Sequence, residues 1–491
     1  MKEKQRFDTA IYGTRAQFIG RKMFVKYIRD PVHGYIGMTD VERRVIDTPV
    51  VQRLRGIKQL SIASVVYPGA EHTRFSHSVG AMHVAGMMVD ALSRTADISD
   101  DERQLIRLAA LLHDVGHGPF SHSSEEILVK HRGLNHEELG KLVITKSELA
   151  DVLRGCGYEP REIVGLGAKA RGKRYMRQVI SSQFDSDRMD FLVRDSYFTG
   201  VEYGKIDISR IVQAMEVVDG SIAVDLKALY ALEAFMIARY EMFLAVYYHH
   251  AVRAAEIMLH RAMESVHDII GLTTFCDISE FLELDDSLIM SRLRALGKGE
   301  RGREVDVERA RRMVEMLSGR KLLKPAYQRA VHVSDPFVAR LLGEESVRRQ
   351  NEEEIARRAG ISPDMVFVDV PTLASVPLYP READPMEIQV FSTSRGPQDR
   401  LKAVRALQAR ERDEGLHRCD QGLHVSGAQG KGGARDLQGL QDPAAFREDK
   451  HVARRGIFRA LATTSLILPC TSSLGPDVSI TVSPSSLASF R

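Results

Sequence analysis

Four side chains of the kind that bind divalent metals stand at three places along the 491-residue chain. His113 and Asp114 are adjacent, His77 ends an Arg-Phe-Ser-His run upstream, and Asp187 lies downstream. Imidazole nitrogen and carboxylate oxygen suit borderline to hard divalent ions, so the set predicts a site for Mn, Fe, Co, Ni, Zn or Mg. Such an ion makes water a nucleophile near neutral pH and offsets the charge of a phosphate group.

A structural role competes with this interpretation for each residue taken alone, because single histidines and aspartates often cap helices or form hydrogen bonds. The complete set in this order, with further histidines close by, favours a metal site. The neighbouring histidines are His117, His122, His131 and His136.

Helices are expected to position these side chains. Ser99 and Glu102 form the pattern of a capping box before the apolar run 105–112, which predicts a helix that begins near Ser99. Two glycines and a proline within 116–119 make its continuation costly. The adjacent histidine and aspartate thus fall at a helix terminus, where side chains can face a pocket.

Two further helices carry the other ligands. Apolar residues at helical spacing over 79–92 place His77 at the opening of one helix. A second helix is expected from about 183 to 197, with four side chains at spacings that place them on one face. These are Asp187, Phe191, Arg194 and Asp195.

The whole chain predicts a mainly α fold: a helical core, a smaller α+β C-terminal lobe and a disordered tail. The apolar run 227–266 contains interspersed charges, which exclude a lipid environment and predict one or two packed helices. Residues 279–323 continue helical, and 365–370 is a strand candidate. The expected divisions are an N-terminal extension at 1–24, a main domain at 25–265, the lobe at 266–390 and the tail at 391–491.

Composition restricts the surroundings of the protein. The chain is 44% hydrophobic, which is enough for a large core. Its four cysteines are widely separated, without the C-x-x-C spacing of a thiolate site, and this fits a reducing, cytoplasmic setting. The start has no apolar signal segment and no uncharged apolar run reaches about 18 residues, so we expect a soluble protein without a membrane partner.

The tail carries the excess positive charge. Residues 391–491 hold 15 Lys and Arg against 10 Asp and Glu, which leaves 54 against 56 in residues 1–390. The nearly neutral body argues against nucleic acid as a partner. Residues 408–449 lack periodicity, which predicts disorder. An altered reading frame is a second explanation for the abrupt change, and sequencing the locus would test it.

Several motifs resemble those of the HD-domain dNTP triphosphohydrolases, over about residues 25–265 and more weakly to about 380. They include Asp30-Pro-Val-His-Gly34, Asp47-Thr-Pro-Val-Val-Gln-Arg-Leu-Arg55, Tyr67-Pro-Gly-Ala70, Arg74-Phe-Ser-His77 and His113-Asp-Val-Gly-His-Gly-Pro-Phe-Ser-His122. The chain is similar in particular to the branch with the eukaryotic sterile-alpha-motif and HD-domain enzyme and its prokaryotic relatives. The sterile-alpha-motif module itself has no counterpart in this sequence.

The resemblance implies roles for two groups of residues. The metal ligands are His77, His113, Asp114 and Asp187. The residues that manage protons are His117, His122, Glu125 and His136. We expect His122 to be the general acid for the departing 5′ oxygen, with the capping of a turn as the alternative. Glu125 stands where the eukaryotic relatives have Asp, which alters its reach to an imidazole.

Substrate contacts carry over from the same resemblance. Arg74, Arg188 and Arg239 would meet the phosphates, because guanidinium groups donate paired hydrogen bonds to oxyanions. The alternative to phosphate binding is that these arginines are exposed and form a solvated surface. Position 188 is Lys in the eukaryotic enzymes, so the charge is kept but the geometry is not.

The sugar and base have their own implied contacts. Gln59 and Leu60 line that pocket, Asp195 holds the 3′ hydroxyl, and Phe191 replaces a Tyr. Leu60 and Tyr247 would exclude a 2′ hydroxyl and so favour deoxynucleotides. A core role for both residues is the alternative that their helical context suggests.

Asp47, Gln52 and Arg55 match residues that bind guanine in the regulatory pocket of the eukaryotic enzymes. A local ion-pair network at a helix start also suits them. Relatives further suggest a symmetric assembly. The expected partners are therefore a deoxynucleotide substrate, an activating nucleotide and further copies of the chain.

The leading hypothesis is hydrolysis of a dNTP to deoxynucleoside and triphosphate, by in-line attack of water at the α-phosphorus, with dGTP as preferred substrate or activator. A second hypothesis keeps the site but takes nucleoside monophosphates or other phosphoesters, because a fold does not determine a substrate. A third is a nucleotide-sensing or single-strand nucleic-acid-binding protein, which steeply salt-dependent binding would indicate.

Overall fold

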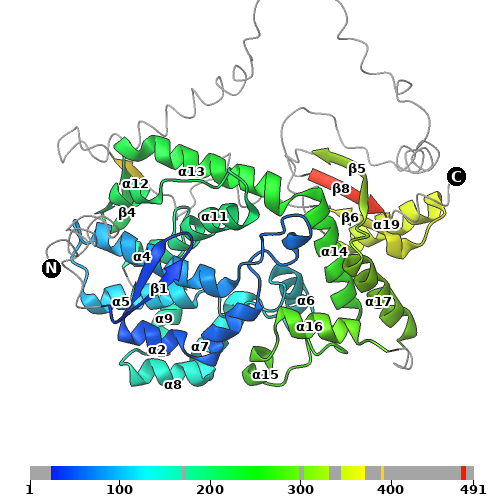
Figure 1. Cartoon of the computed structure of the whole chain (residues 1–491), viewed down its shortest axis with the longest axis horizontal. Helices are drawn as coiled ribbons and strands as arrows, with labels where there is room; N and C mark the ends of the chain where they lie inside the picture. Colours follow the sequence, from blue (N-terminus) through cyan, green and yellow to red (C-terminus); the bar gives the residue numbers. More distant parts are fainter. Residues whose placement is uncertain are drawn as a thin grey trace, which may run out of the picture. The chain divides into compact units, whose positions relative to one another are not determined.

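The computed structural model describes residues 24–167, 173–297, 303–330, 344–370, 389–391 and 477–482. These residues fall into two compact units that divide between Leu322 and Leu323. The first is mainly helical and the second is a small α+β unit (Figure 1), so the predicted mainly α fold is confirmed. Residues 1–23 of the expected 1–24 extension and most of the 391–491 tail, with its predicted disorder, lie outside the described residues.

The first unit combines two antiparallel hairpins with a long series of helices. Its strands are β1 (Lys26–Asp30), β2 (Gly34–Met38), β3 (Met215–Val218) and β4 (Ser221–Asp225). Its helices are α2 (Asp40–Ile46), α3 (Pro49–Gln52), α4 (Arg74–Leu92), α5 (Asp100–Leu112), α6 (His122–Arg132), α7 (His136–Lys146), α8 (Glu148–Gly155), α9 (Pro160–Gly167), α10 (Arg174–Ile180), α11 (Ser186–Thr199), α12 (Ile208–Gln213), α13 (Leu229–Met242), α14 (His250–Ser265), α15 (Ile278–Leu282), α16 (Asp286–Arg294) and α17 (Glu304–Ser318). Within the described ranges, no helix has both the length and the apolar character that crossing a membrane requires.

Local signals explain where α5 begins and ends. The Oγ of Ser99 accepts a hydrogen bond from the Glu102 N–H at 3.2 Å, and Glu102 Oε2 accepts one from the Ser99 N–H at 3.1 Å. This is the predicted capping box. The helix ends at Leu112 with His113 as its C-cap. The adjacent ligand candidates therefore emerge at a helix terminus, as predicted.

Helix α4 is buried along most of its length and packs against both α5 and α11. It begins at Arg74, earlier than the apolar spacing indicated, so His77 lies in its first turn. Gly80 allows the close approach of α11, because a Cβ at this position would overlap the side chains of Asp190 and Arg194. This contact brings α11 next to His77.

A buried ion pair joins α5 to the first hairpin and to α2. Arg107 donates to Glu42 Oε1 from Nε at 2.6 Å and to Oε2 from Nη2 at 2.9 Å, and Nη2 also donates to the Gly37 carbonyl at 3.0 Å. Gly86 of α4 leaves room for this guanidinium, since a Cβ there would overlap it. The pair therefore fixes the positions of α5, α2 and the first hairpin relative to one another around α4.

The apolar run 227–266 forms the packed helices α13 and α14, with a π-helical turn, Phe243–Tyr247, between them. Helix α14 packs against α17 and α6. Helices α15 to α17 thus belong to the first compact unit, which extends to Leu322. The sequence had suggested a domain boundary at 265, and that boundary of the family domain stays a prediction.

The second unit contains β5 (Lys324–Ala330), α19 (Glu345–Ala359), β6 (Val366–Asp369), β7 (Gln389–Phe391) and β8 (Asp477–Val482). Strand β8, from the segment assigned to the tail, pairs antiparallel with both β5 and β6. The strand predicted at 365–370 is β6. Helix α19 covers β6 through an apolar cluster that includes Ile355, Ala356 and Val366.

Replacing Arg107 by Met is expected to lower the free energy of unfolding by about 3–5 kcal/mol, because the buried Glu42 carboxylate loses its partner. Urea denaturation followed by circular dichroism measures this loss. Arg43→Met is the matched control, since Arg43 pairs with Asp40 at the surface, and exposed pairs contribute at most about 1 kcal/mol. Equal losses in the two variants would contradict the role assigned to the buried pair.

Candidate metal centre and active site

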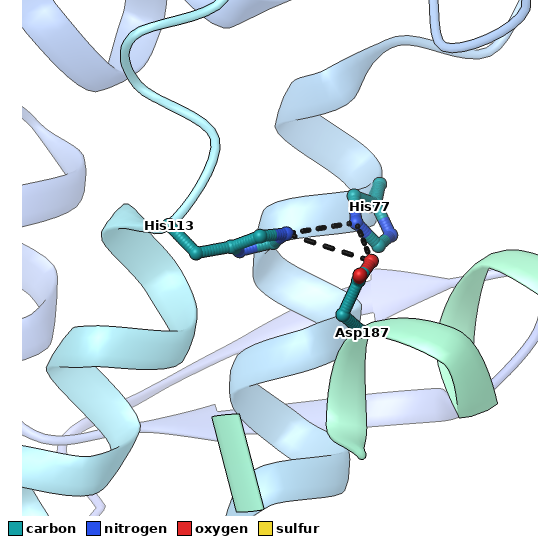
Figure 2. Close-up of side chains that lie close together, drawn as sticks. All are labelled: His77, His113 and Asp187. Atoms are coloured by element: carbon teal, nitrogen blue, oxygen red, sulfur yellow. Dashed lines mark hydrogen bonds and ion pairs between the residues drawn. The ribbon is translucent and has the colours of Figure 1, made fainter. Parts of the chain in front are cut away.

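Three helices bring three of the predicted metal ligands together (Figure 2). His77 Nε2 of α4 lies 3.3 Å from His113 Nε2 at the end of α5 and 3.0 Å from Asp187 Oδ1 of α11. His113 Nε2 lies 3.6 Å from the same oxygen. One ligand atom from each residue lies within 4.8 Å of the other two. The predicted convergence of distant residues is thus present in the structure.

Asp114, the fourth predicted ligand, lies beside this group. Its Oδ1 is 3.2 Å from His113 Nε2 and its Oδ2 is 3.7 Å from His77 Nε2. Arg74 Nη1 donates to Oδ2 at 2.6 Å. Burial opposes the ionisation of Asp114, but His113 and Arg74 outweigh burial and hold its pKa well below the usual range. Asp114 is therefore a carboxylate at the edge of the three-ligand group.

The donor set suits a divalent cation for an electrostatic reason. His113 Nδ1 donates to the Ala110 carbonyl at 2.7 Å and His77 Nδ1 donates to Asp190 Oδ2 at 2.8 Å, so in the neutral form of each ring, the form that binds a metal, Nε2 carries the lone pair. These lone pairs face each other and Asp187, an arrangement that positive charge stabilises. Burial lowers the pKa of His77, but Asp187 and Asp190 outweigh burial and raise that pKa to about 10. The raised pKa shows the same preference of this site for positive charge.

A buried network behind His77 fixes the orientation of its ring. Asp190 accepts hydrogen bonds from His77 Nδ1 at 2.8 Å, His33 Nε2 at 2.6 Å and Arg194 Nε at 2.8 Å. Arg194 also donates to Asp30 Oδ2 at 2.8 Å. Groups that accept the second N–H of a ligating histidine determine its tautomer and orientation. The turn between β1 and β2 is therefore part of the support of this centre.

Sequence reasoning assigned no role to Asp190, His33 or Asp30. A local signal existed for Asp190, which lies three residues after Asp187 and four before Arg194, a spacing that places all three on one side of a helix. No local pattern links His33 to Asp190, because 157 residues separate them. That contact is visible only in three dimensions.

Three of the predicted proton-handling residues form a cluster beside Asp114. The Nδ1 of His117 is 3.6 Å from Asp114 Oδ1, and the rings of His117 and His136 are 4.3 Å apart. Glu125 Oε1 accepts from His136 Nδ1 at 2.5 Å. Burial lowers the pKa of His136, but Glu125 outweighs burial and raises it. Burial, reinforced by Arg74, holds the pKa of His117 well below its usual range.

His122 lies outside this cluster. Its side chain is 81% exposed, its Nδ1 is 3.4 Å from Glu125 Oε2, and its ring is 6.1 Å from that of His117. The structure thus brings His117, Glu125 and His136 together and places His122 at the rim. The role of His122 as general acid stays a prediction.

Arg74, the first of the three predicted phosphate ligands, is buried and already has protein partners. Besides Asp114, it contacts Ser121, whose Oγ accepts from Arg74 Nε at 2.8 Å. The guanidinium therefore connects the start of α4 to the loop that precedes α6. This contact supports the loop whether or not Arg74 also meets a phosphate.

Arg188 and Arg239 lie near each other on the Asp187 side of the centre. Arg188 forms an ion pair with Asp185. Arg239 is buried and donates to Gln183 Oε1 at 3.1 Å, while its Nε has no hydrogen-bond partner among the described residues. Burial and the like charge of Arg188 lower the pKa of Arg239 to about 10. The two guanidinium groups thus concentrate positive charge beside the metal ligands.

Two of the residues predicted to contact the sugar, Tyr247 and Phe191, form a group with Asp195. Its Oδ1 accepts from His72 Nε2 at 2.7 Å and its Oδ2 accepts from the Tyr247 hydroxyl at 2.7 Å. The Phe191 ring lies edge-on to Tyr247 with 6.4 Å between centroids. Burial and Asp195 raise the pKa of Tyr247 well above its usual value, so its hydroxyl remains a donor. His72 is a member of this group that sequence reasoning did not include.

Gln59 and Leu60 follow a segment that pairs with the start of α4. The Gln59 N–H donates to the His72 carbonyl at 3.0 Å, and its side-chain oxygen is buried without a hydrogen-bond partner in the described part of the chain. Leu60 packs against an apolar cluster with Ala63 and Val252. Gln59 thus offers a vacant acceptor, whereas Leu60 has the core contacts that were its alternative.

The residues matched to a regulatory pocket make local contacts. Asp47 pairs with Arg43 at 3.2 Å, and Arg55 Nε donates to Gln52 Oε1 at 2.8 Å. The Arg55 guanidinium lies 3.5 Å from the centroid of the Phe75 ring. These contacts are the local network that was the alternative to guanine binding, and the regulatory role stays a prediction.

Comparisons with known proteins agree with this geometry. Residues 74–194 match the family model described as the HD domain, and residues 206–413 match the model described as the HD associated region. The second match runs past residue 391, where the expected tail begins.

Relatives and a solved structure point to the same family. The uncharacterized protein YwfO of Bacillus subtilis is 36% identical over 291 residues, which cover 55% of this chain and 66% of that protein. The deoxynucleoside triphosphate triphosphohydrolase SAMHD1 homolog of Dictyostelium discoideum is 30% identical over 315 residues, 61% of this chain and 59% of that protein. The chain thus spans less than two thirds of either relative.

The crystal structure of a phosphohydrolase from Bacteroides thetaiotaomicron superposes with a TM-score of 0.60 and 26% identity, over 76% of this chain and 92% of that one. Both family matches contain residues of the site, since His77, His113, Asp114 and Asp187 fall in the first and Arg239 and Tyr247 in the second. The chain therefore belongs to the HD-domain phosphohydrolases and is related to the deoxynucleoside triphosphate triphosphohydrolase SAMHD1.

Proposed function

We propose that this chain hydrolyses a dNTP to a deoxynucleoside and inorganic triphosphate. The observation that carries the proposal is the convergence of His77, His113 and Asp187 beside Arg188 and Arg239, because groups that could hold a cation lie next to groups suited to phosphates. The relative from Dictyostelium, a deoxynucleoside triphosphate triphosphohydrolase SAMHD1 homolog, supports the same substrate class. The substrate, the activating nucleotide and the assembly of copies are parts of this proposal.

The metal ligands would be His77, His113, Asp114 and Asp187. A divalent cation bound there offsets negative charge on the phosphate and acidifies water. Asp190 holds the His77 ring with its Nε2 toward the other ligands. The Ala110 carbonyl does the same for His113. These contacts orient the donors before any cation binds, which reduces the reorganisation that binding requires.

Arg188 and Arg239 would bind the triphosphate. Burial is the main cause of the lowered pKa of Arg239, and repulsion by the like charge of Arg188 adds to it. An anion between them removes that repulsion, and the unpartnered Nε of Arg239 has a donor to offer. The energetic preference of this pair is therefore for a ligand with several negative charges.

Asp195 and Tyr247 would select the sugar. A carboxylate that already accepts from Tyr247 and His72 still has lone pairs for a 3′ hydroxyl. The Tyr247 ring would lie against the 2′ side and leave little room for a ribose hydroxyl. The vacant side-chain oxygen of Gln59 can accept from the sugar or the base.

The histidine cluster would move protons. Glu125 favours the protonated form of His136, and the neighbouring His117 is kept neutral, so a proton can pass between the adjacent rings toward the metal side. His122 at the rim would protonate the departing 5′ oxygen. Its exposure suits a residue that acts on the outward-facing part of a substrate.

A panel of dNTPs, supplied to protein whose metal content has been measured, tests the proposed function. Release of inorganic triphosphate and deoxynucleoside is the expected result. Turnover of nucleoside monophosphates or of a simple phosphoester alone would instead assign the site to the broader phosphohydrolase class. Binding without turnover of any of these would contradict an enzymatic role.

Asp187→Ala is expected to remove metal and activity together, because it deletes the oxygen that lies 3.0 Å from His77 Nε2. Metal analysis of the purified variant and a turnover assay on the same sample measure both. Asp151→Ala is the control, since that carboxylate is 85% exposed and lies on α8. Full turnover by a verified metal-free Asp187→Ala protein would contradict the proposed site.

Gly80→Ala is expected to weaken metal binding on the order of 10- to 100-fold, because the new methyl group displaces Asp190 from His77. Metal affinity is measured by competition with a chelator of known strength. Gly155→Ala is the matched helical control, since the nearest atom to its Cβ would be a flexible Arg44 nitrogen at 3.7 Å. Unchanged affinity in folded Gly80→Ala protein would remove the role of Asp190.

His122→Asn is expected to lower dNTP turnover on the order of 100-fold or more while sparing an ester with a p-nitrophenolate leaving group, which departs without a proton. The ratio of the two rates separates the general acid from other roles. His131→Asn serves as an exposed histidine control on the same helix. The same selectivity in His117→Asn, and not in His122→Asn, would transfer the role to His117.

A further inference from the structure

The segment between α15 and α16 reaches two loops next to the active site. Asp286, the first residue of α16, is buried, and its two oxygens accept from different segments. Oδ1 accepts from the Phe120 N–H at 2.7 Å and Oδ2 accepts from the Lys58 N–H at 2.9 Å. Phe120 lies between His117 and α6, and Lys58 directly precedes Gln59. One carboxylate therefore joins the proton-handling loop to the segment of the proposed sugar and base pocket.

The loop at Phe120 has a conformation that its own sequence does not favour. Phe120 has φ +57° and Ser121 has φ +50°, values that L-residues other than glycine rarely adopt. Such conformations persist where the surroundings determine them. Asp286 binds the N–H of Phe120. On the other side, Arg74 donates to the Ser121 hydroxyl. The carboxylate from α16 thus helps to hold this pair of residues, together with Arg74 and with Ser124, whose hydroxyl donates to the Ser121 carbonyl at 3.0 Å.

A second contact ties the same segment to His117. Arg53 donates from Nη1 to the His117 carbonyl at 3.0 Å and from Nε to the Leu284 carbonyl at 3.1 Å. Its guanidinium lies 4.7 Å from the centroid of the Phe281 ring. Arg53 therefore bridges the loop between α15 and α16 to His117, while Asp286 at the start of α16 binds Phe120 directly.

The surroundings of Asp286 disfavour its ionised form. Burial and the neighbouring Asp285 raise its pKa to about 6, although Lys58 and the two N–H groups oppose the rise. Because the folded-state pKa lies above the unfolded value near 3.8, folding stability from this group is present at low pH and is lost as pH rises through about 6. At neutral pH the ionised form thus costs stability, yet it is the form with two acceptors for the two N–H groups.

We propose that Asp286 is a positioning residue that sets the relative placement of the loop 117–121 and the Lys58–Gln59 segment. The HD associated region, which supplies α16, then determines the geometry of the HD-domain site. This inference rests on the proposed hydrolase function for its kinetic readout. The backbone placement itself is measurable without turnover.

Asp286→Asn tests the proposal with nearly the same shape. The amide keeps one acceptor oxygen and presents an NH2 group to the other N–H, so one of the two contacts is lost. We expect kcat to fall on the order of 10- to 100-fold, because small displacements of reacting groups are costly, with KM changed less than about twofold. Metal content should equal that of the wild type. Amide hydrogen exchange should become faster in peptides that cover 57–60 and 117–122.

Asp285→Asn is the matched control. It removes the same charge one residue earlier, and Asn replaces Asp well at an N-cap, where Asp285 accepts from the Leu288 N–H at 2.7 Å. Wild-type kcat and exchange are expected for this variant. The proposal is overturned if Asp286→Asn behaves like the wild type in both measurements, or if Asp285→Asn loses as much.

A second variant covers the case in which Asp286→Asn does not fold. Arg53→Lys keeps the charge but cannot reach both carbonyls, so faster exchange at 117–122 and a lower kcat are expected, and the absence of both contradicts the proposal. Turnover is assayed with the four dNTPs and with p-nitrophenyl phosphate. If the wild type turns over none of these, the proposed function fails, while the exchange data still decide whether Asp286 positions the two segments.

Discussion

The close approach of α4 and α11 is the constraint on which the metal centre depends. Gly80 lets the Asp190 carboxylate reach the far side of the His77 ring, where any side chain at position 80 would overlap it. Asp187, about one turn earlier on α11, faces the other side of the same ring. One helix thus supplies both a ligand and the group that orients a neighbouring ligand, so the two cannot move independently.

Buried ion pairs around the centre also restrict how the helices can be arranged. Arg194 lies between two buried carboxylates, and the Arg74–Asp114 and Arg107–Glu42 pairs are likewise removed from water. A buried charge is costly unless its partner is in place. The Arg194–Asp30, Arg74–Asp114 and Arg107–Glu42 pairs each join segments that are distant in sequence. Displacing one segment would therefore strand a charge, which favours a single arrangement of the helices.

Local patterns predicted much of this arrangement, and long-range contacts account for the rest. The capping box at Ser99 and the glycines after Asp114 located α5 and its two ligand candidates, because both signals act within a few residues. The contact between Asp190 and His33, 157 residues apart, is one that no periodicity reveals. The outward position of His122 follows a turn in which Phe120 and Ser121 adopt positive φ. The residue types at these two positions do not predict such a turn, because residues other than glycine rarely adopt positive φ.

The turn at Asp30–His33 extends the support of the centre beyond the recognised family boundary. Similarity to the HD domain begins at residue 74, yet Asp30 and His33 reach Arg194 and Asp190 from the first hairpin. A fragment trimmed to residue 74 would leave Arg194 with half of its counter-charge and Asp190 without one of its donors. The smallest portion of this polypeptide able to assemble a complete centre therefore starts upstream of Asp30.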